Sequence, residues 1–149
     1  MVDIQRAGVK DHGIVTALLL EFARTQGRPP EADLDRWERV VAELLNSDGW
    51  LFLLAFEGDE PVGLAAVNWF LTLYGSSVDG RLIAIVVDGE HRRRGIGTKL
   101  MEDLLAAARR RGCSELEVSV GQGDTIEQFY RKFAPRNEHL LLTWKCHER

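Results

Sequence analysis

The feature that most constrains the fold is an apolar run followed by a basic, glycine-containing turn and a strongly periodic helix. Residues 82–87 (LIAIVV) form the run, residues 91–98 (HRRRGIGT) the turn, and the periodic pattern continues to about residue 111. The first N–H groups of a helix have no internal partner and attract anions, and glycine lets an anion approach the backbone closely. Three arginines add charge at the same point. The pattern predicts a strand, a phosphate-binding turn and a helix.

The spacing of this turn separates it from two better-known phosphate loops. A P-loop needs G-x-x-x-x-G-K-[ST], whereas the order here is Gly97-Thr98-Lys99 and the first glycine is missing. A dinucleotide fingerprint needs G-x-G-x-x-G, and only Gly95 and Gly97 are present. The remaining spacing is R-x-x-G-x-G. A plain helix start has little need of two glycines, because each costs about 1 kcal/mol relative to alanine.

The longer run 87–97 (VDGEHRRRGIG) resembles the coenzyme A loop of the GNAT family of N-acetyltransferases, V-x-P-E-x-R-x-x-G-x-G, with Gly89 where proline is common. The resemblance implies acetyl-CoA as a cosubstrate and no metal. It also implies that the diphosphate binds the turn and that the pantetheine arm pairs with the preceding strand. The implied cofactor-binding residues are Ile85, Val86, Val87, Arg92, Arg93, Arg94, Gly95, Ile96, Gly97 and Thr98.

Length, charge and cysteine content limit the classes of protein to which the chain can belong. A chain of 149 residues predicts one domain, 1–149, with a substantial core. The net charge of −4 argues against a nucleic-acid or membrane partner. Cys113 and Cys146 form no C-x-x-C pair and lack a histidine at the usual zinc spacing, so no metal site is expected. The N-terminus has no apolar signal core, and a cytoplasmic location is the expectation.

The order of predicted elements is β-α-α-β-β-β-α-β-α-β. Strands are predicted at 2–7, 50–56, 61–74, 81–87, 115–120 and 139–146, and helices at 11–27, 31–46, 94–111 and 124–133. The nearly continuous apolar run 81–87 indicates a strand buried on both faces. This order predicts an α+β fold: a single mixed, mostly antiparallel sheet with helices on both faces and a central parallel β-α-β crossover. The same order matches the GNAT fold, in which the strands flanking the crossover splay apart around the pantetheine arm.

A second local signal lies at 123–134 and resembles the family motif N-x-x-A-x-x-x-Y-x-x-x-G-F. Tyr130 matches the tyrosine, and the resemblance implies a general acid that protonates the departing thiolate sulfur. The rest of the motif departs from the pattern at Gly123, Ile126 and Ala134-Pro135, which replace Asn, Ala and Gly-Phe. The alternative for Tyr130 is an amphipathic aromatic residue packed against Phe129 and Phe133.

The residue that takes the amine's proton and the residues that hold the amine are not identified by the sequence. Many family members place a carboxylate on the strand before the loop, but residues 81–87 contain none. The candidates for the base are a water relay and four carboxylates, each of which is equally explained as a solvated residue: Glu21, Asp79, Glu115 and Glu117. Four aromatic residues are candidates for the acceptor site, and each is equally explained as core: Trp37, Trp69, Phe70 and Tyr74.

The sequence therefore predicts an acetyl-CoA-dependent N-acetyltransferase that transfers the acetyl group directly to a primary amine of a small molecule or peptide. The alternative is an acyl-CoA-binding module of the same fold with little catalysis, suggested by the degenerate tyrosine motif and the missing carboxylate. A nucleic-acid surface is disfavoured, because arginines 109–111 lie at a predicted helix C-terminus, where cations are stabilising anyway. Residues 140–142 (LLL) suit either a homodimer interface or the core.

Overall fold

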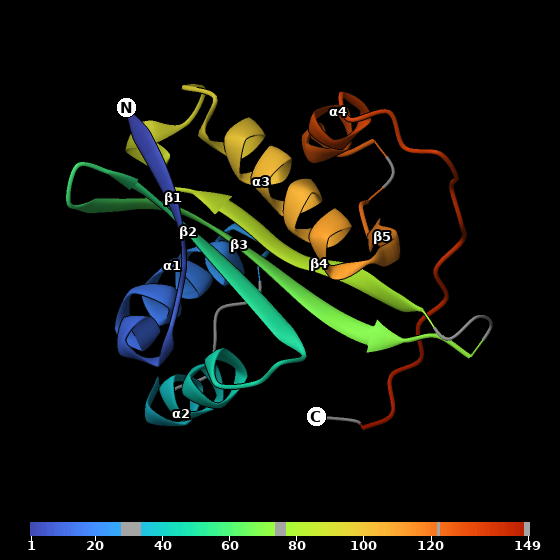
Figure 1. The fold of residues 1–149 in the computed structure, drawn as a ribbon, viewed down its shortest axis with the longest axis horizontal. Helices are drawn as coiled ribbons and strands as arrows, with labels where there is room; N and C mark the ends of the chain where they lie inside the picture. The colour runs from blue at the N-terminus through green and yellow to red at the C-terminus, as the bar shows by residue number, and fades with distance from the viewer. Residues whose placement is uncertain (28–33, 74–76, 122, 148–149) are drawn as a thin grey trace. The chain divides into compact units, whose positions relative to one another are not determined.

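A computed structural model describes residues 1–27, 34–73, 77–121 and 123–147. The chain divides into two compact units, Met1–Glu117 and Val118–Arg149. The first unit contains the helices α1, α2 and α3 and nearly all of the sheet, and the second contains a short helix and the C-terminal segment (Figure 1).

The sheet has five strands in the order β1-β2-β3-β4-β5. Their bounds are β1 (Val2–Arg6), β2 (Trp50–Glu57), β3 (Glu60–Leu71), β4 (Val78–Val87) and β5 (Cys113–Val118). The first four strands pair antiparallel in sequence order. Between β4 and β5, Asp79 contacts Glu115 and Arg81 contacts Glu117, so the contacts advance in the same direction along both strands. This direction fits the predicted parallel crossover and makes the sheet mixed.

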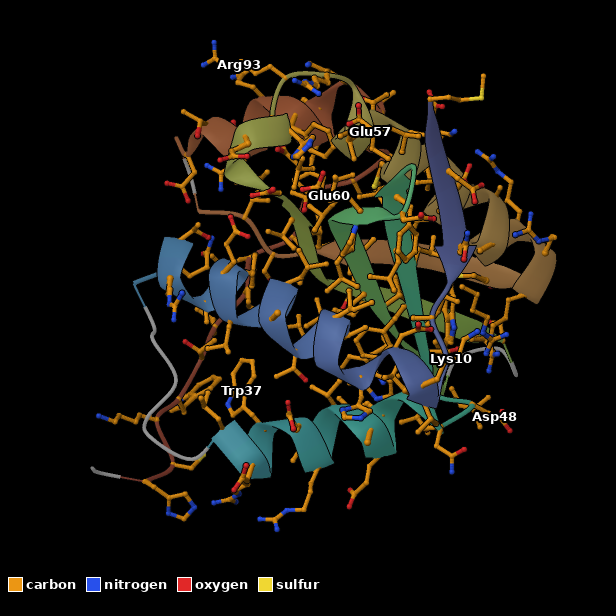
Figure 2. The ribbon with its side chains drawn as sticks, turned by 90° about the vertical axis from the view of Figure 1, so that its left-hand side faces the viewer. Lys10, Trp37, Asp48, Glu57, Glu60 and Arg93 are labelled. Carbon is orange, nitrogen blue, oxygen red and sulfur yellow. The ribbon has the colours of Figure 1, made fainter. Side chains whose placement is uncertain are left out.

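Helices cover both faces of the sheet, as predicted. On one face, α1 (His12–Thr25) and α2 (Leu34–Leu45) contribute Val15, Leu18 and Val41 to a buried cluster with side chains of β2, β3 and β4. Figure 2 shows these two helices lying across the strands. On the other face, α3 (Ile96–Arg111) packs so closely on β3 that a Cβ at Gly63 would lie 3.1 Å from Leu100 Cδ1. No α-helix in the described part of the chain is long and apolar enough to cross a bilayer.

The helix α3 forms where its periodicity predicts it. Its buried residues follow helical spacing and are Ile96, Leu100, Met101, Leu104 and Ala108. Gly112 ends the helix with φ +79°, and its N–H donates to the carbonyl oxygens of Ala108 and Arg109, as expected for a left-handed C-terminal residue. The predicted start at residue 94 is wrong by two residues, because Gly95 holds φ +80° and the helix begins after it.

The prediction that β4 is buried on both faces is wrong. The ladder between β3 and β4 shifts register, so that Ala66 pairs with Ala84 while Val67 pairs with Leu82. Ile83 is the extra residue, and its side chain is 43% exposed. An extra residue of this kind interrupts the ladder and bends the strand. The strand also begins earlier than predicted, at Val78, inside what the sequence indicated as a loop.

The second unit contains α4 (Thr125–Arg131), which begins after Asp124 and matches the predicted helix. The predicted strand at 139–146 is wrong, because the described residues of this segment form no strand. Leu140, Leu141 and Leu142 are exposed, which also contradicts their assignment to the core. Strand propensity reflects packing on a half-buried surface, so an apolar run without a neighbouring strand does not form a ladder. The strand predicted at 115–120 likewise ends earlier, at Val118.

Candidate active site

The turn between β4 and α3 presents unbonded backbone donors beside three arginines. A short 3-10 turn, η2 (Gly89–His91), follows β4, and Arg93 and Gly95 then adopt positive φ values of +65° and +80°. The first intrahelical donor of α3 is Lys99, whose N–H binds the Gly95 carbonyl oxygen at 3.0 Å. The N–H groups of the three residues before Lys99 therefore have no partner within the helix, and no side chain caps it. This end of α3 fits an anion.

The arginines of the turn lie beside carboxylates that a bound anion would replace. Arg92 donates to the Val87 carbonyl oxygen at 3.2 Å and lies 3.9 Å from the Glu21 carboxylate. Arg94 lies 3.5 Å from the Glu57 carboxylate. Both guanidinium groups are more than half exposed, so these pairs contribute little to stability and remain accessible to a ligand.

A pocket of about 360 Å³ opens beside the N-terminus of α3. Its lining residues are Met1, Val2, Glu57, Arg94, Gly95, Ile96 and Lys99. The Lys99 ammonium group donates to the Val2 carbonyl oxygen and so anchors the start of β1 to this helix. The pocket thus brings two cations, Arg94 and Lys99, next to the unbonded donors of the helix.

The predicted pantetheine strand is exposed along part of its outer edge. The side-chain contacts to β5 involve Asp79 and Arg81, and β5 ends at Val118. In that register, the part of β4 that contains Ile85, Val86 and Val87 extends beyond the end of β5. The alternate backbone groups of a strand point to its two neighbours, so those of this part that face away from β3 have no partner in β5. One of them, the Val87 carbonyl oxygen, accepts from Arg92.

Tyr130 lies on α4, and its surroundings favour the protonated phenol. Burial raises the pKa of the Tyr130 hydroxyl to about 12, because an apolar environment disfavours the phenolate. The ring packs edge-on against Phe129 with 5.2 Å between centroids, and Phe129 packs in the same way on Phe133. The aromatic packing expected from the sequence is therefore present, and it is compatible with a hydroxyl that acts as an acid.

The four candidate bases fall into two groups. Asp79, Glu115 and Glu117 lie together where β4 meets β5, and Glu21 lies beside Arg92 of the turn between β4 and α3. Arg81 pairs with Glu117 at 2.6 Å. Asp79 accepts the N–H of Glu115 at 3.2 Å. These contacts give Asp79 and Glu117 a structural role between β4 and β5.

The aromatic candidates for the acceptor site are only partly supported. Trp69 is a core residue, because its ring fills the space above Gly80, where a Cβ would lie 2.7 Å from it. Phe70 carries the Arg81 guanidinium over its ring at 5.7 Å. Trp37 is half-buried on α2, and Tyr74 lies outside the described residues.

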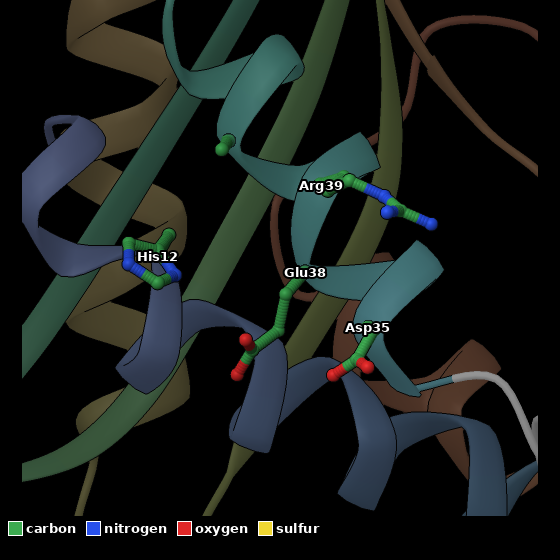
Figure 3. A pocket seen from close by; sticks show the side chains of 5 residues that line it. His12, Asp35, Glu38 and Arg39 are labelled. Atoms are coloured by element: carbon green, nitrogen blue, oxygen red, sulfur yellow. The ribbon is translucent and has the colours of Figure 1, made fainter.

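A second pocket, of about 330 Å³, lies between α1 and α2 (Figure 3). It is lined by His12, Asp35, Glu38, Arg39 and Ala42. The His12 Nδ1 atom is buried and has no hydrogen-bond partner among the described residues. No local pattern predicts this pocket, because its lining residues come from two helices that meet only in the folded chain.

The comparisons with known proteins agree with the fold and with the family resemblance. The model of the acetyltransferase (GNAT) family matches residues 13–134. The chain therefore belongs to this family, as the resemblance predicted. A search of curated proteins found no match.

Several solved structures share the fold at low sequence identity. An aminoglycoside acetyltransferase from an uncultured soil metagenomic sample, in complex with sisomicin, superposes with a TM-score of 0.83 at 19% identity, covering 99% of this chain and 97% of that one. A ribosomal-protein-alanine N-acetyltransferase from Brucella melitensis biovar Abortus gives 0.80 at 19%, covering 97% and 99%. A predicted acetyltransferase from Clostridium acetobutylicum, solved with acetyl-CoA, gives 0.83 at 15%, covering 97% and 96%. At these identities the likeness establishes the fold.

Proposed function

We propose that this chain is an acetyl-CoA-dependent N-acetyltransferase that transfers an acetyl group directly to a primary amine of a small molecule or peptide. The observation that carries the proposal is the uncapped N-terminus of α3 behind a turn with three arginines, in a chain of the acetyltransferase family. Two structural neighbours, an aminoglycoside acetyltransferase and a ribosomal-protein-alanine N-acetyltransferase, support an amine acceptor.

The donor set fits the diphosphate of coenzyme A. The backbone N–H groups of residues 95–98 would bind its oxygens, and Arg92 and Arg94 would exchange their present carboxylate contacts for the phosphates. The backbone of Ile85, Val86 and Val87 would pair with the pantetheine arm as an added strand does. The strained turn at Arg93, with φ +65°, lies within this segment, as expected where a ligand fixes the backbone.

In this proposal the amine nitrogen attacks the thioester carbonyl, a carbon–nitrogen bond forms, and the carbon–sulfur bond breaks. The largest contribution of the protein is to hold the two reactants together in the correct orientation. Tyr130 donates its hydroxyl proton to the leaving sulfur. Its pKa of about 12 keeps the phenol protonated at neutral pH, so the proton is present, but it also makes the phenol a weaker acid than one whose pKa lies near the working pH. The amine proton leaves to water or to one of the carboxylates named above.

The second candidate is a module that binds acyl-CoA with little catalysis. It is favoured by the degenerate motif around Tyr130 and by the absence of a carboxylate among residues 81–87. The two candidates share the cofactor site and differ only in turnover, so they are separated by activity and not by binding.

Calorimetric titration with acetyl-CoA tests the shared site. We expect micromolar binding by the wild type and loss of binding in Arg94→Glu, because the new carboxylate repels the phosphates. Arg110→Glu is the matched control: it makes the same charge change on the exposed face at the other end of α3 and should keep the wild-type affinity. Equal affinity in both variants, or no binding to folded wild type, would refute the proposed site.

Turnover tests the catalytic part. The wild type should release free coenzyme A with at least one amine of a panel. In Tyr130→Phe the kcat of this reaction should fall strongly, while the affinity for acetyl-CoA stays unchanged. Binding without turnover by any amine would favour the module.

A further inference from the structure

His91 is a buried imidazole among carboxylates, at the start of the phosphate turn. The residue is only 9% exposed, although it belongs to the short turn η2 on the surface of the first unit. Its Nδ1 atom lies 3.1 Å from Asp88 Oδ2, and its Nε2 atom lies 3.7 Å from Glu57 Oε2 and 3.8 Å from Glu60 Oε2. Figure 2 shows Glu57 and Glu60 close together at one end of the molecule's strands. These two residues flank the turn between β2 and β3.

The Nε2 atom is aimed at carboxylates without bonding to them. Distances of 3.7 and 3.8 Å are too long for hydrogen bonds. On the other side of the ring, the 3.1 Å between Nδ1 and Asp88 Oδ2 matches the separation of two ligands on one metal ion, roughly 3–4 Å when each ligand is about 2.0–2.2 Å from zinc.

Three residues supply side-chain donors that converge here. One donor atom each of Glu60, Asp88 and His91 lies within 4.8 Å of the other two. The imidazole and Asp88 are held in place by their contact and by the 2.9 Å backbone bond from His91 N–H to the Asp88 carbonyl oxygen. The Glu60 side chain is 62% exposed, so it can move the short distance that closes a coordination shell.

We propose that Glu60, Asp88 and His91 form a binding site for a divalent transition-metal ion, with Zn²⁺ as the best match. One imidazole nitrogen and two carboxylate oxygens suit zinc and leave a fourth position for water. Glu57, between the ring and Arg94, adds negative charge that favours a cation. The ion links the hairpin end to the turn that precedes Arg92, and so stabilises the folded chain. No pattern in the sequence predicts this site, because Glu60 is distant from the other two ligands along the chain.

Titration of the metal-free protein with Zn²⁺ tests the proposal independently of acetyl transfer. We expect one equivalent to bind, with a rise in the melting temperature. Co²⁺ should bind at the same place and give a visible absorption band. Glu60→Gln should weaken Zn²⁺ binding by about tenfold or more while the protein stays folded, because this side chain is exposed. His91→Asn should abolish binding.

Cys146 and His147 provide the control, because two adjacent metal-binding side chains can hold zinc adventitiously. A Cys146→Ser, His147→Asn variant should keep the stoichiometry and affinity of the wild type. No saturable binding by the wild type would overturn the proposal, and so would binding that is lost in this control variant and kept in Glu60→Gln.

Discussion

Adding one methyl group at Gly63 should destabilise the fold beneath the phosphate turn. A Cβ at this position would lie 3.1 Å from Leu100 Cδ1, 3.1 Å from the Val86 carbonyl oxygen and 3.3 Å from Ile96 Cγ2. Carbon atoms pack best at about 3.5–4.0 Å. Leu100 and Ile96 are 0% and 2% exposed and have no free space to enter, and the Val86 oxygen belongs to the backbone of the sheet. We expect Gly63→Ala to lower the free energy of unfolding by about 1–3 kcal/mol.

Urea unfolding followed by tryptophan fluorescence measures this change, and a melting curve should shift down by about 2–4 °C per kcal/mol for a chain of this size. Gly13→Ala is the matched control. Gly13 is exposed on α1, and a Cβ there meets nothing within 4 Å, so the change should stabilise the protein by up to about 1 kcal/mol. If Gly63→Ala were as stable as the wild type while Gly13→Ala behaved as expected, the close packing of α3 on β3 would be refuted.

Three further predictions follow from particular residues. Arg93→Gly should raise the free energy of unfolding by up to about 1 kcal/mol, because φ +65° strains any residue with a Cβ; a loss of stability in the urea assay would contradict this. Absorbance titration should show a tyrosine with a pKa near 12, and this signal should disappear in Tyr130→Phe. Since that pKa exceeds the unfolded value of 10.0, the stability that the group contributes below pH 10 should be lost as the pH rises through 12. A Tyr130 hydroxyl that titrates with the unfolded pKa would refute the prediction. Leu104→Ala, at a fully buried position, should cost about 2–5 kcal/mol by the same urea assay, and a loss below about 1 kcal/mol would argue against this core.

The elements with local signals were predictable from the sequence. The helix α3 is specified by its own periodicity and by Gly112, which ends it, and the glycine–arginine turn is specified by residues adjacent in the chain. The turn therefore forms at the residues that the sequence indicated, and its binding of a phosphate stays a prediction. The family assignment rests on the same local pattern, which the family model then matched over most of the chain.

The missed features depend on pairs of distant segments. The apolar run at 140–142 has the composition of a strand, but a strand requires a partner, and propensity alone does not supply one. The register shift at Ile83 arises from the pairing of β4 with β3 and leaves no mark in the sequence of β4 itself. The role of Trp69 as core was decided by Gly80 of the neighbouring strand.

The sequence by itself determined the order of the main elements, the glycine–arginine turn and the family, because each depends on residues close together in the chain. Only the tertiary structure decided which carboxylates surround the arginines and His91. Glu57 and Glu60 reach the turn from the β2–β3 hairpin, about thirty residues away, because antiparallel pairing brings Val87 opposite Gly63. Charge and coordination depend on distance in space, and folding sets that distance.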